Sequence, residues 1–95
     1  MEYIKLNNGV DIPILGYGTF QIPSSIAEEC VLNALNVGYR MIDTAAAYFN
    51  EKEIGRAIKK SKISREEIFV VTKVWIQDAG YENTMKAFYT SLKNL

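Results

Sequence analysis

Residues 38–55 read GYRMIDTAAAYFNEKEIG, and this stretch decides how the chain folds. Residues 39–43 are mostly apolar and end in Asp43, which is typical of a short buried strand. Asn50 followed by Glu53 has the spacing of a helix N-cap, and apolar residues then recur at helical spacing. The stretch therefore predicts a strand, a loop with polar side chains and a helix.

The same alternation continues on both sides of this stretch. Earlier in the chain, we expect a hairpin over residues 1–12 that turns at Asn7-Asn8-Gly9, a strand over 14–20, and a helix capped by Ser25 and Glu28 that ends at Gly38. Later, we expect a capped turn at 64–67, a strand over 68–73 and a helix whose apolar stripe is Met85, Phe88, Tyr89, Leu92 and Leu95.

Short apolar strands that alternate with helices indicate parallel strands joined by right-handed crossovers. This pattern leaves two architectures open, part of a (β/α) barrel or part of a doubly wound sheet. Gly16-Tyr17-Gly18 begins a dinucleotide-binding fingerprint, but Gln21 stands where its third glycine belongs. The glycines fit close backbone approach at a strand end as well as they fit direct contact with a ligand.

Composition excludes several classes of function. Lys plus Arg and Asp plus Glu number 11 each, so no basic excess favours nucleic acid or an anionic membrane. The chain has no histidine, and its one cysteine, Cys30, lies on an apolar helix stripe as an expected core thiol, so no metal site is predicted. With no signal peptide and no membrane-length apolar run, a cytoplasmic protein is expected.

Four segments together resemble the aldo-keto reductase family, in order and in spacing. They are residues 38–55, Gly18-Thr19-Phe20 after the first predicted parallel strand, Thr72-Lys73-Val74-Trp75 after the third, and Ser91–Leu95 at the end of the last helix. The resemblance favours the barrel. It implies an α/β fold that is a partial (β/α)₈ TIM barrel, with the hairpin of residues 1–12 followed by three βα units in residues 13–95.

The resemblance also implies a chemistry, which is hydride transfer between NADPH and an aldehyde or ketone. Tyr48 would donate the proton to the carbonyl oxygen, Lys73 would supply a nearby positive charge that favours the phenolate, and Asp43 would hold Lys73. Taken singly, each of these residues has an ordinary explanation as a turn acid, a solvated charge or a packing residue. All three fall at or just beyond strand ends, where barrel enzymes carry their reactive groups.

Further roles follow from the resemblance for neighbouring residues. The implied cofactor-binding residues are Gly18, Thr19, Phe20, Asp43 and Lys73. The implied substrate-binding residues are Phe20, Tyr48, Phe49 and Trp75. The sequence departs from the family pattern at Met41 and at Phe49, where glycine is common, so Phe49 is expected to narrow the pocket.

The length of the chain sets a further expectation. A closed barrel takes about 250 residues, whereas this sequence has 95 and ends at Leu95, before the fourth strand that carries a substrate-binding histidine in the family. We expect little reductase activity from the chain alone, and association with itself or a complementary chain through open sheet edges. The alternative is a non-catalytic remnant or interaction module that keeps the fold of three βα units.

Overall fold

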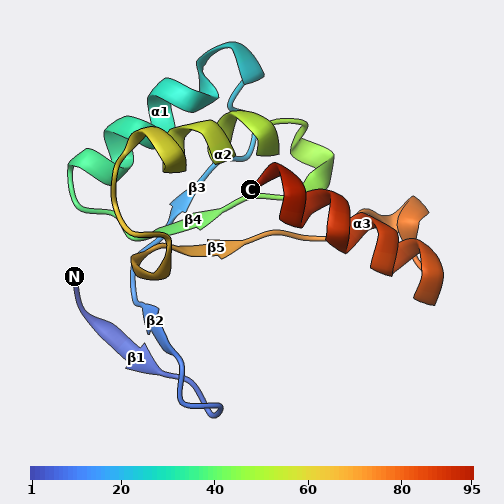
Figure 1. Cartoon of the computed structure of the whole chain (residues 1–95), viewed down its shortest axis with the longest axis horizontal. Helices are drawn as coiled ribbons and strands as arrows, with labels where there is room; N and C mark the ends of the chain where they lie inside the picture. The colour runs from blue at the N-terminus through green and yellow to red at the C-terminus, as the bar shows by residue number, and fades with distance from the viewer.

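The computed structural model describes residues 1–95, and strands and helices alternate along it as the sequence predicts (Figure 1). Its strands are β1 (Tyr3–Lys5), β2 (Asp11–Pro13), β3 (Tyr17–Gly18), β4 (Met41–Asp43) and β5 (Phe69–Val71). Its α-helices are α1 (Ser24–Asn36), α2 (Glu51–Lys60) and α3 (Tyr81–Asn94), and short 3₁₀ turns occupy Ala46–Tyr48, Arg65–Glu67 and Ile76–Asp78.

The three later strands form a parallel sheet in the order β3-β4-β5. Figure 1 shows α1 and α2 side by side over one face of this sheet. Ile42 of β4 points to that face and is fully buried. The buried core between the sheet and the two helices consists of Val31, Leu35, Ile42, Ile54, Ala57, Ile58 and Ile68.

The N-terminal hairpin stands apart from the parallel sheet. Strands β1 and β2 pair antiparallel, with Ile4 opposite Ile12, and Gly9 at the turn has a φ of 86° that favours glycine. The hairpin lies beside the turn before β5 and beside the amino end of that strand, with a small cavity between them. It is therefore at the opposite end of the sheet from the residues expected to react.

Two predicted helix caps are wrong. Helix α1 begins at Ser24 after Pro23 and has no side-chain cap, so the Ser25–Glu28 spacing does not form a capping box. Glu28 instead forms salt bridges with Arg56 and Lys60 of α2, so its carboxylate joins the two helices. Asn50 does precede α2, but its side chain makes no cap hydrogen bond either.

Two further expectations need correction. The first parallel strand is confined to Tyr17–Gly18, and Ile14 and Leu15 before it are exposed, because only these two residues pair with β4. Cys30 is half-buried and is not a core thiol. By contrast, Gly38 ends α1 with a φ of 115°, as its position predicts.

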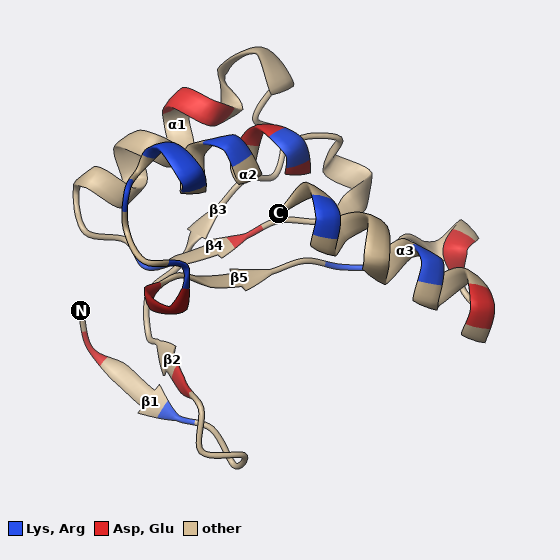
Figure 2. Ribbon diagram, in the orientation of Figure 1, with Lys and Arg blue, Asp and Glu red and all other residues tan.

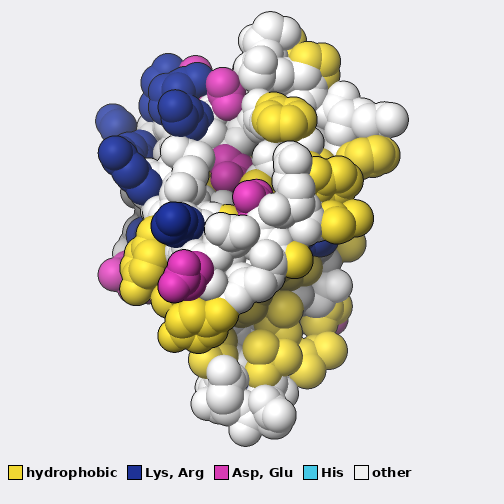
Figure 3. Space-filling view, turned by 90° about the vertical axis from the view of Figure 1, so that its right-hand side faces the viewer, with side chains coloured by type: hydrophobic (Ala, Val, Ile, Leu, Met, Phe, Trp, Pro, Cys, Tyr) yellow, Lys and Arg dark blue, Asp and Glu magenta, His cyan; other side chains and the backbone are white.

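Helix α3 keeps its apolar stripe largely in contact with solvent. Phe88, Tyr89 and Leu92 are all exposed, and Ser91 is its one buried residue. Seen from the side on which α3 lies, the surface carries hydrophobic side chains along one edge and basic side chains at the opposite upper edge (Figure 3). No helix in the chain has the length and apolar character needed to cross a membrane.

Candidate active site

The pairing of β4 with β5 brings Asp43 and Lys73 together. Asp43 lies opposite Val71 in the parallel register, and Lys73 is two residues further along, so both side chains leave the same face of the sheet. Figure 2 shows an acidic position where β4 ends and a basic position on the segment after β5. The Nζ atom of Lys73 donates to Oδ1 of Asp43 at 2.5 Å and to the carbonyl oxygen of Thr44 at 2.9 Å.

A 3₁₀ turn returns Tyr48 to this ion pair. The turn spans Ala46–Tyr48, and the Ala46 amide donates to the carbonyl oxygen of Lys73 at 3.2 Å. Nζ of Lys73 consequently lies 5.4 Å from the centre of the Tyr48 ring. The ring of Phe20, from the loop after β3, packs against Tyr48 with ring centres 5.3 Å apart. The loops that follow the three parallel strands therefore come together around the Tyr48 ring.

The ammonium of Lys73 is held in its charged form. Its hydrogen bond to Asp43 raises the pKa of Lys73 above the ordinary lysine value, and the nearby Tyr48 acts in the same direction. The side chains of Lys73 and Asp43 are 50% and 46% exposed, so water screens part of this interaction. The charge is thus both fixed in place and accessible to a bound molecule.

Buried polar side chains form hydrogen bonds that hold the strand ends beside this cluster. The Thr19 hydroxyl donates to the carbonyl oxygen of Asp43 at 3.1 Å, and the Thr44 hydroxyl donates to Oδ1 of Asn50 at 3.0 Å. Nδ2 of Asn50 donates to the carbonyl oxygens of Thr19 and Ile22, each at 3.2 Å. Thr19, Thr44 and Asn50 are fully buried. Sequence reasoning assigned Asn50 only a capping role and missed this network.

The carboxyl end of β3 has room for a bound group. A Cβ atom built on Gly18 would meet no atom of the chain, so internal packing does not require glycine there. A Cβ on Gly16 would lie 2.5 Å from the Met41 side chain, so that glycine serves packing. Beyond Gly18, the side chain of Thr19 is engaged within the chain, while Phe20 is 65% exposed. Gly18, Phe20 and Lys73 are all open to solvent, and their cofactor-binding role stays a prediction.

The expected aromatic pocket is only partly assembled in these residues. Phe20 and Tyr48 are in contact, and Trp75 lies exposed just after β5. Phe49 is 84% exposed, with a left-handed φ of 57°. It borders a hollow between the start of α2 and Asn94, and its substrate-binding role stays a prediction.

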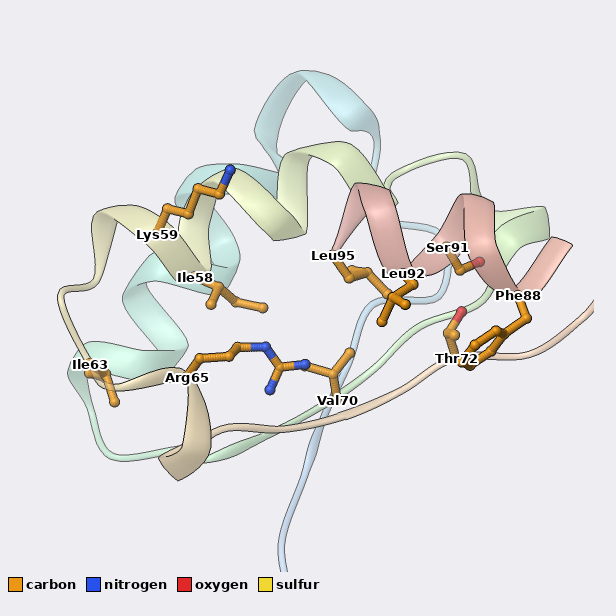
Figure 4. Close-up of a pocket in the computed structure, with 10 residues that line it drawn as sticks. All are labelled: Ile58, Lys59, Ile63, Arg65, Val70, Thr72, Phe88, Ser91, Leu92 and Leu95. Carbon is orange, nitrogen blue, oxygen red and sulfur yellow. The ribbon is translucent and has the colours of Figure 1, made fainter. Parts of the chain in front are cut away.

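The largest cavity lies elsewhere in the structure. It has a volume of about 490 Å³ and opens between α2, β5 and α3. Figure 4 shows apolar side chains from these elements around it, with Arg65 and Lys59 at one side. None of the implied catalytic residues lines it. Side chains of α2, of β5 and of α3 form its walls, so it is a gap in helix packing rather than part of the Lys73 site.

A parallel α/β chain with a lysine, an aspartate and a tyrosine at its strand ends has clear relatives. The sequence model described as the aldo/keto reductase family matches residues 14–95, and the chain belongs to this family. An aldo-keto reductase of Mycolicibacterium smegmatis is 52% identical over 92 residues, which are 97% of this chain and 34% of that protein. Glyoxal reductase of Bacillus subtilis is 48% identical over 95 residues, covering 99% and 34%.

Solved structures agree with this assignment. MGS-M4, an aldo-keto reductase from a Medee basin deep-sea metagenome library, has a TM-score of 0.92 and 58% identity, over 96% of this chain and 34% of its own. An aldo-keto reductase of Bombyx mori in complex with NADP has a TM-score of 0.92 and 35% identity, over 99% and 34%. The chain spans about a third of the length of the relatives it matches.

Proposed function

We propose that residues 1–95 form the proton-donating part of an NADP-dependent reductase of aldehydes or ketones, built on a (β/α)₈ barrel. One observation carries this proposal: the ammonium of Lys73, fixed by Asp43 and the Thr44 carbonyl, lies 5.4 Å from the centre of the Tyr48 ring. The names of two relatives fit the substrate class, since one is a glyoxal reductase and another is an aldehyde reductase of Saccharomyces cerevisiae.

In this proposal each residue has a defined part. When bound, NADPH supplies the hydride that adds to the carbonyl carbon. The carbonyl oxygen then takes the hydroxyl proton of Tyr48, and the Lys73 ammonium stabilises the phenolate that remains. Asp43 keeps Lys73 charged and oriented. Gly18 and Phe20 border the surface where the cofactor would lie.

One observation favours a second candidate function, an interaction module. Helix α3 and the segment before it expose Ile76, Phe88 and Leu92. β5 also has a strand partner on one side only. Apolar patches and unpaired strand edges are common sites of protein association. This function would need the surface of α3 and would not need Tyr48 or Lys73.

A chimera tests the catalytic proposal. Residues 1–95 would replace the matching segment of the Bacillus subtilis glyoxal reductase, to which 99% of the chain aligns. We expect NADPH oxidation in the presence of glyoxal. The Tyr48→Phe variant should lose about 10²–10⁴-fold in kcat, because it removes a general acid. Circular dichroism would verify that both chimeras are folded.

The control for this test is Tyr81→Phe, which removes a hydroxyl from an exposed tyrosine at the start of α3. Its kcat should stay within about twofold of that of the parent chimera. A folded, active chimera whose kcat survives Tyr48→Phe would refute the role of Tyr48. A folded chimera that binds NADPH but never oxidises it would favour the interaction module.

A further inference from the structure

Asn50 connects two of the three strand ends. Its side chain is fully buried, and both the nitrogen and the oxygen of its amide form hydrogen bonds. Nδ2 donates to the carbonyl oxygens of Thr19 and Ile22 in the loop after β3, and Oδ1 accepts from the hydroxyl of Thr44 directly after β4. The side chain of a helix cap would accept from the amides of α2, and the side chain of Asn50 does not. Its hydrogen bonds therefore hold the loop that carries Phe20 and the residue directly after Asp43.

Glu51, the next residue, connects the third strand end. Its side chain is buried, and Oε2 accepts from the Thr72 hydroxyl at 2.6 Å while Oε1 accepts from the Ser91 hydroxyl at 3.1 Å. No lysine or arginine is paired with it. A buried carboxylate without a cation is costly, although the positive end of the α2 dipole offsets part of the cost. The catalytic proposal leaves this group without a role.

Along the sequence, each member of the proposed catalytic set lies within two residues of Asn50 or of a residue that Asn50 or Glu51 binds. Tyr48 is two residues before Asn50, Asp43 directly precedes Thr44, and Lys73 directly follows Thr72. Each of these three side chains is thus one or two peptide units from a hydrogen bond made by Asn50 or Glu51. A shift of either buried side chain would be passed to the ion pair through the backbone.

We propose that Asn50 and Glu51 are positioning residues that jointly fix the carboxyl ends of β3, β4 and β5, and thereby hold Lys73 against Asp43 and beside Tyr48. The catalytic meaning of this geometry rests on the proposed function. The positioning itself does not, because it is a property of the 95-residue chain. Asn50 and Glu51 contact neither cofactor nor substrate in this proposal, and they act through Thr44, Thr72 and the loop after β3.

The sharpest test is a matched pair of substitutions at Thr72. Thr72→Val removes the hydroxyl that Glu51 accepts and keeps the shape, whereas Thr72→Ser keeps the hydroxyl. In the 95-residue chain labelled with ¹⁵N-lysine, the pKa of Lys73 is read from its Nζ signal, which Lys73→Arg assigns. We expect Thr72→Val and Glu51→Gln to lower that pKa toward the ordinary lysine value, and Thr72→Ser to leave it unchanged.

Control substitutions separate positioning from general loosening of the fold. Lys52→Ala changes an exposed residue of the same helix and should leave the Lys73 signal as it is. Ile58→Val removes one methylene group from the core, lowers stability and should also leave the pKa of Lys73 unchanged. If Glu51→Gln does not fold, the comparison of Thr72→Val with Thr72→Ser still tests the proposal. Thr72 is only half-buried, so both of its variants are expected to fold.

The outcomes also separate this inference from the proposed function. If the pKa of Lys73 is the same in Thr72→Val and Thr72→Ser, the positioning proposal is wrong, whatever the chimera does. If Thr72→Val changes the pKa of Lys73 and Thr72→Ser does not, the positioning proposal is supported. This result would stand even if the chimera with Tyr48→Phe stayed active. In an active chimera, Thr72→Val should lower kcat several-fold with KM within about twofold, because it disturbs the proton donor and not the binding surface.

Discussion

Replacing Asp43 by Asn keeps the shape of the side chain and removes the charge that Lys73 contacts at 2.5 Å. Unit charges about 2.5 Å apart attract by about 1.7 kcal/mol at a dielectric of about 80 and by about 6.6 kcal/mol at about 20. Both side chains are half exposed, so the lower value is the relevant one, and the entropy of ordering Lys73 reduces it further. We therefore expect Asp43→Asn to lower the free energy of unfolding by up to about 1 kcal/mol at pH 8.

The same substitution has a signature in its pH dependence. Asp43 raises the pKa of Lys73 in the folded chain, so the ion pair contributes fully below the unfolded lysine pKa of about 10.4. As the pH rises through the folded-state pKa, Lys73 loses its proton and the contribution disappears. The difference in unfolding free energy between the parent chain and Asp43→Asn should therefore be largest near pH 8–9 and shrink above about pH 10.4.

Urea titrations followed by the fluorescence of Trp75, the one tryptophan, would measure this difference at several pH values. The matched control is Asp11→Asn in the hairpin, where Asp11 pairs with Lys5 at 3.0 Å and both side chains are more exposed. We expect that control to cost less than about 0.5 kcal/mol. A cost for Asp43→Asn that is absent at pH 8, or that stays constant up to pH 11, would refute the reasoning.

Two other substitutions test the local geometry. Phe49 has a left-handed φ of 57° and an exposed side chain, so Phe49→Gly should raise stability by up to about 1 kcal/mol, seen as a higher Tm, while Phe49→Ala should bring no such gain. A Cβ on Gly55 would collide with the backbone carbonyl oxygen of Asn94, so Gly55→Ala should displace the end of α3 and weaken amide-exchange protection there; intact protection in α3 would contradict this contact.

The sequence contains enough information to predict the position of the ion pair. Asp43 ends one apolar run, and Lys73 follows another with the spacing that places both on one face of adjacent parallel strands. The role of Tyr48 came from the family resemblance, because neither spacing nor periodicity distinguishes a catalytic tyrosine in a loop from a packing residue. Its approach to Lys73 depends on the 3₁₀ turn and on the amide of Ala46, which are tertiary features.

The misassigned residues share a physical cause. Ser25, Glu28 and Asn50 fit the spacing of helix caps, but spacing does not reveal whether a better hydrogen-bond partner lies on another element. Glu28 forms salt bridges with Arg56 and Lys60, and Asn50 forms hydrogen bonds with Thr44 and two carbonyl oxygens. In the same way, Glu51 looks like a first-turn acid of a helix, and only the packing of β5 and α3 turns it into a buried acceptor.

The central claim is that Lys73 acts on the reaction through Tyr48, and a double-mutant cycle in the chimera tests it most directly. Tyr48→Phe, Lys73→Met and the double variant would be compared by kcat with glyoxal and NADPH. If the two residues act as a unit, the double variant loses no more than about the larger single loss. If the two losses multiply, Lys73 acts independently of Tyr48, and the account of the site is wrong.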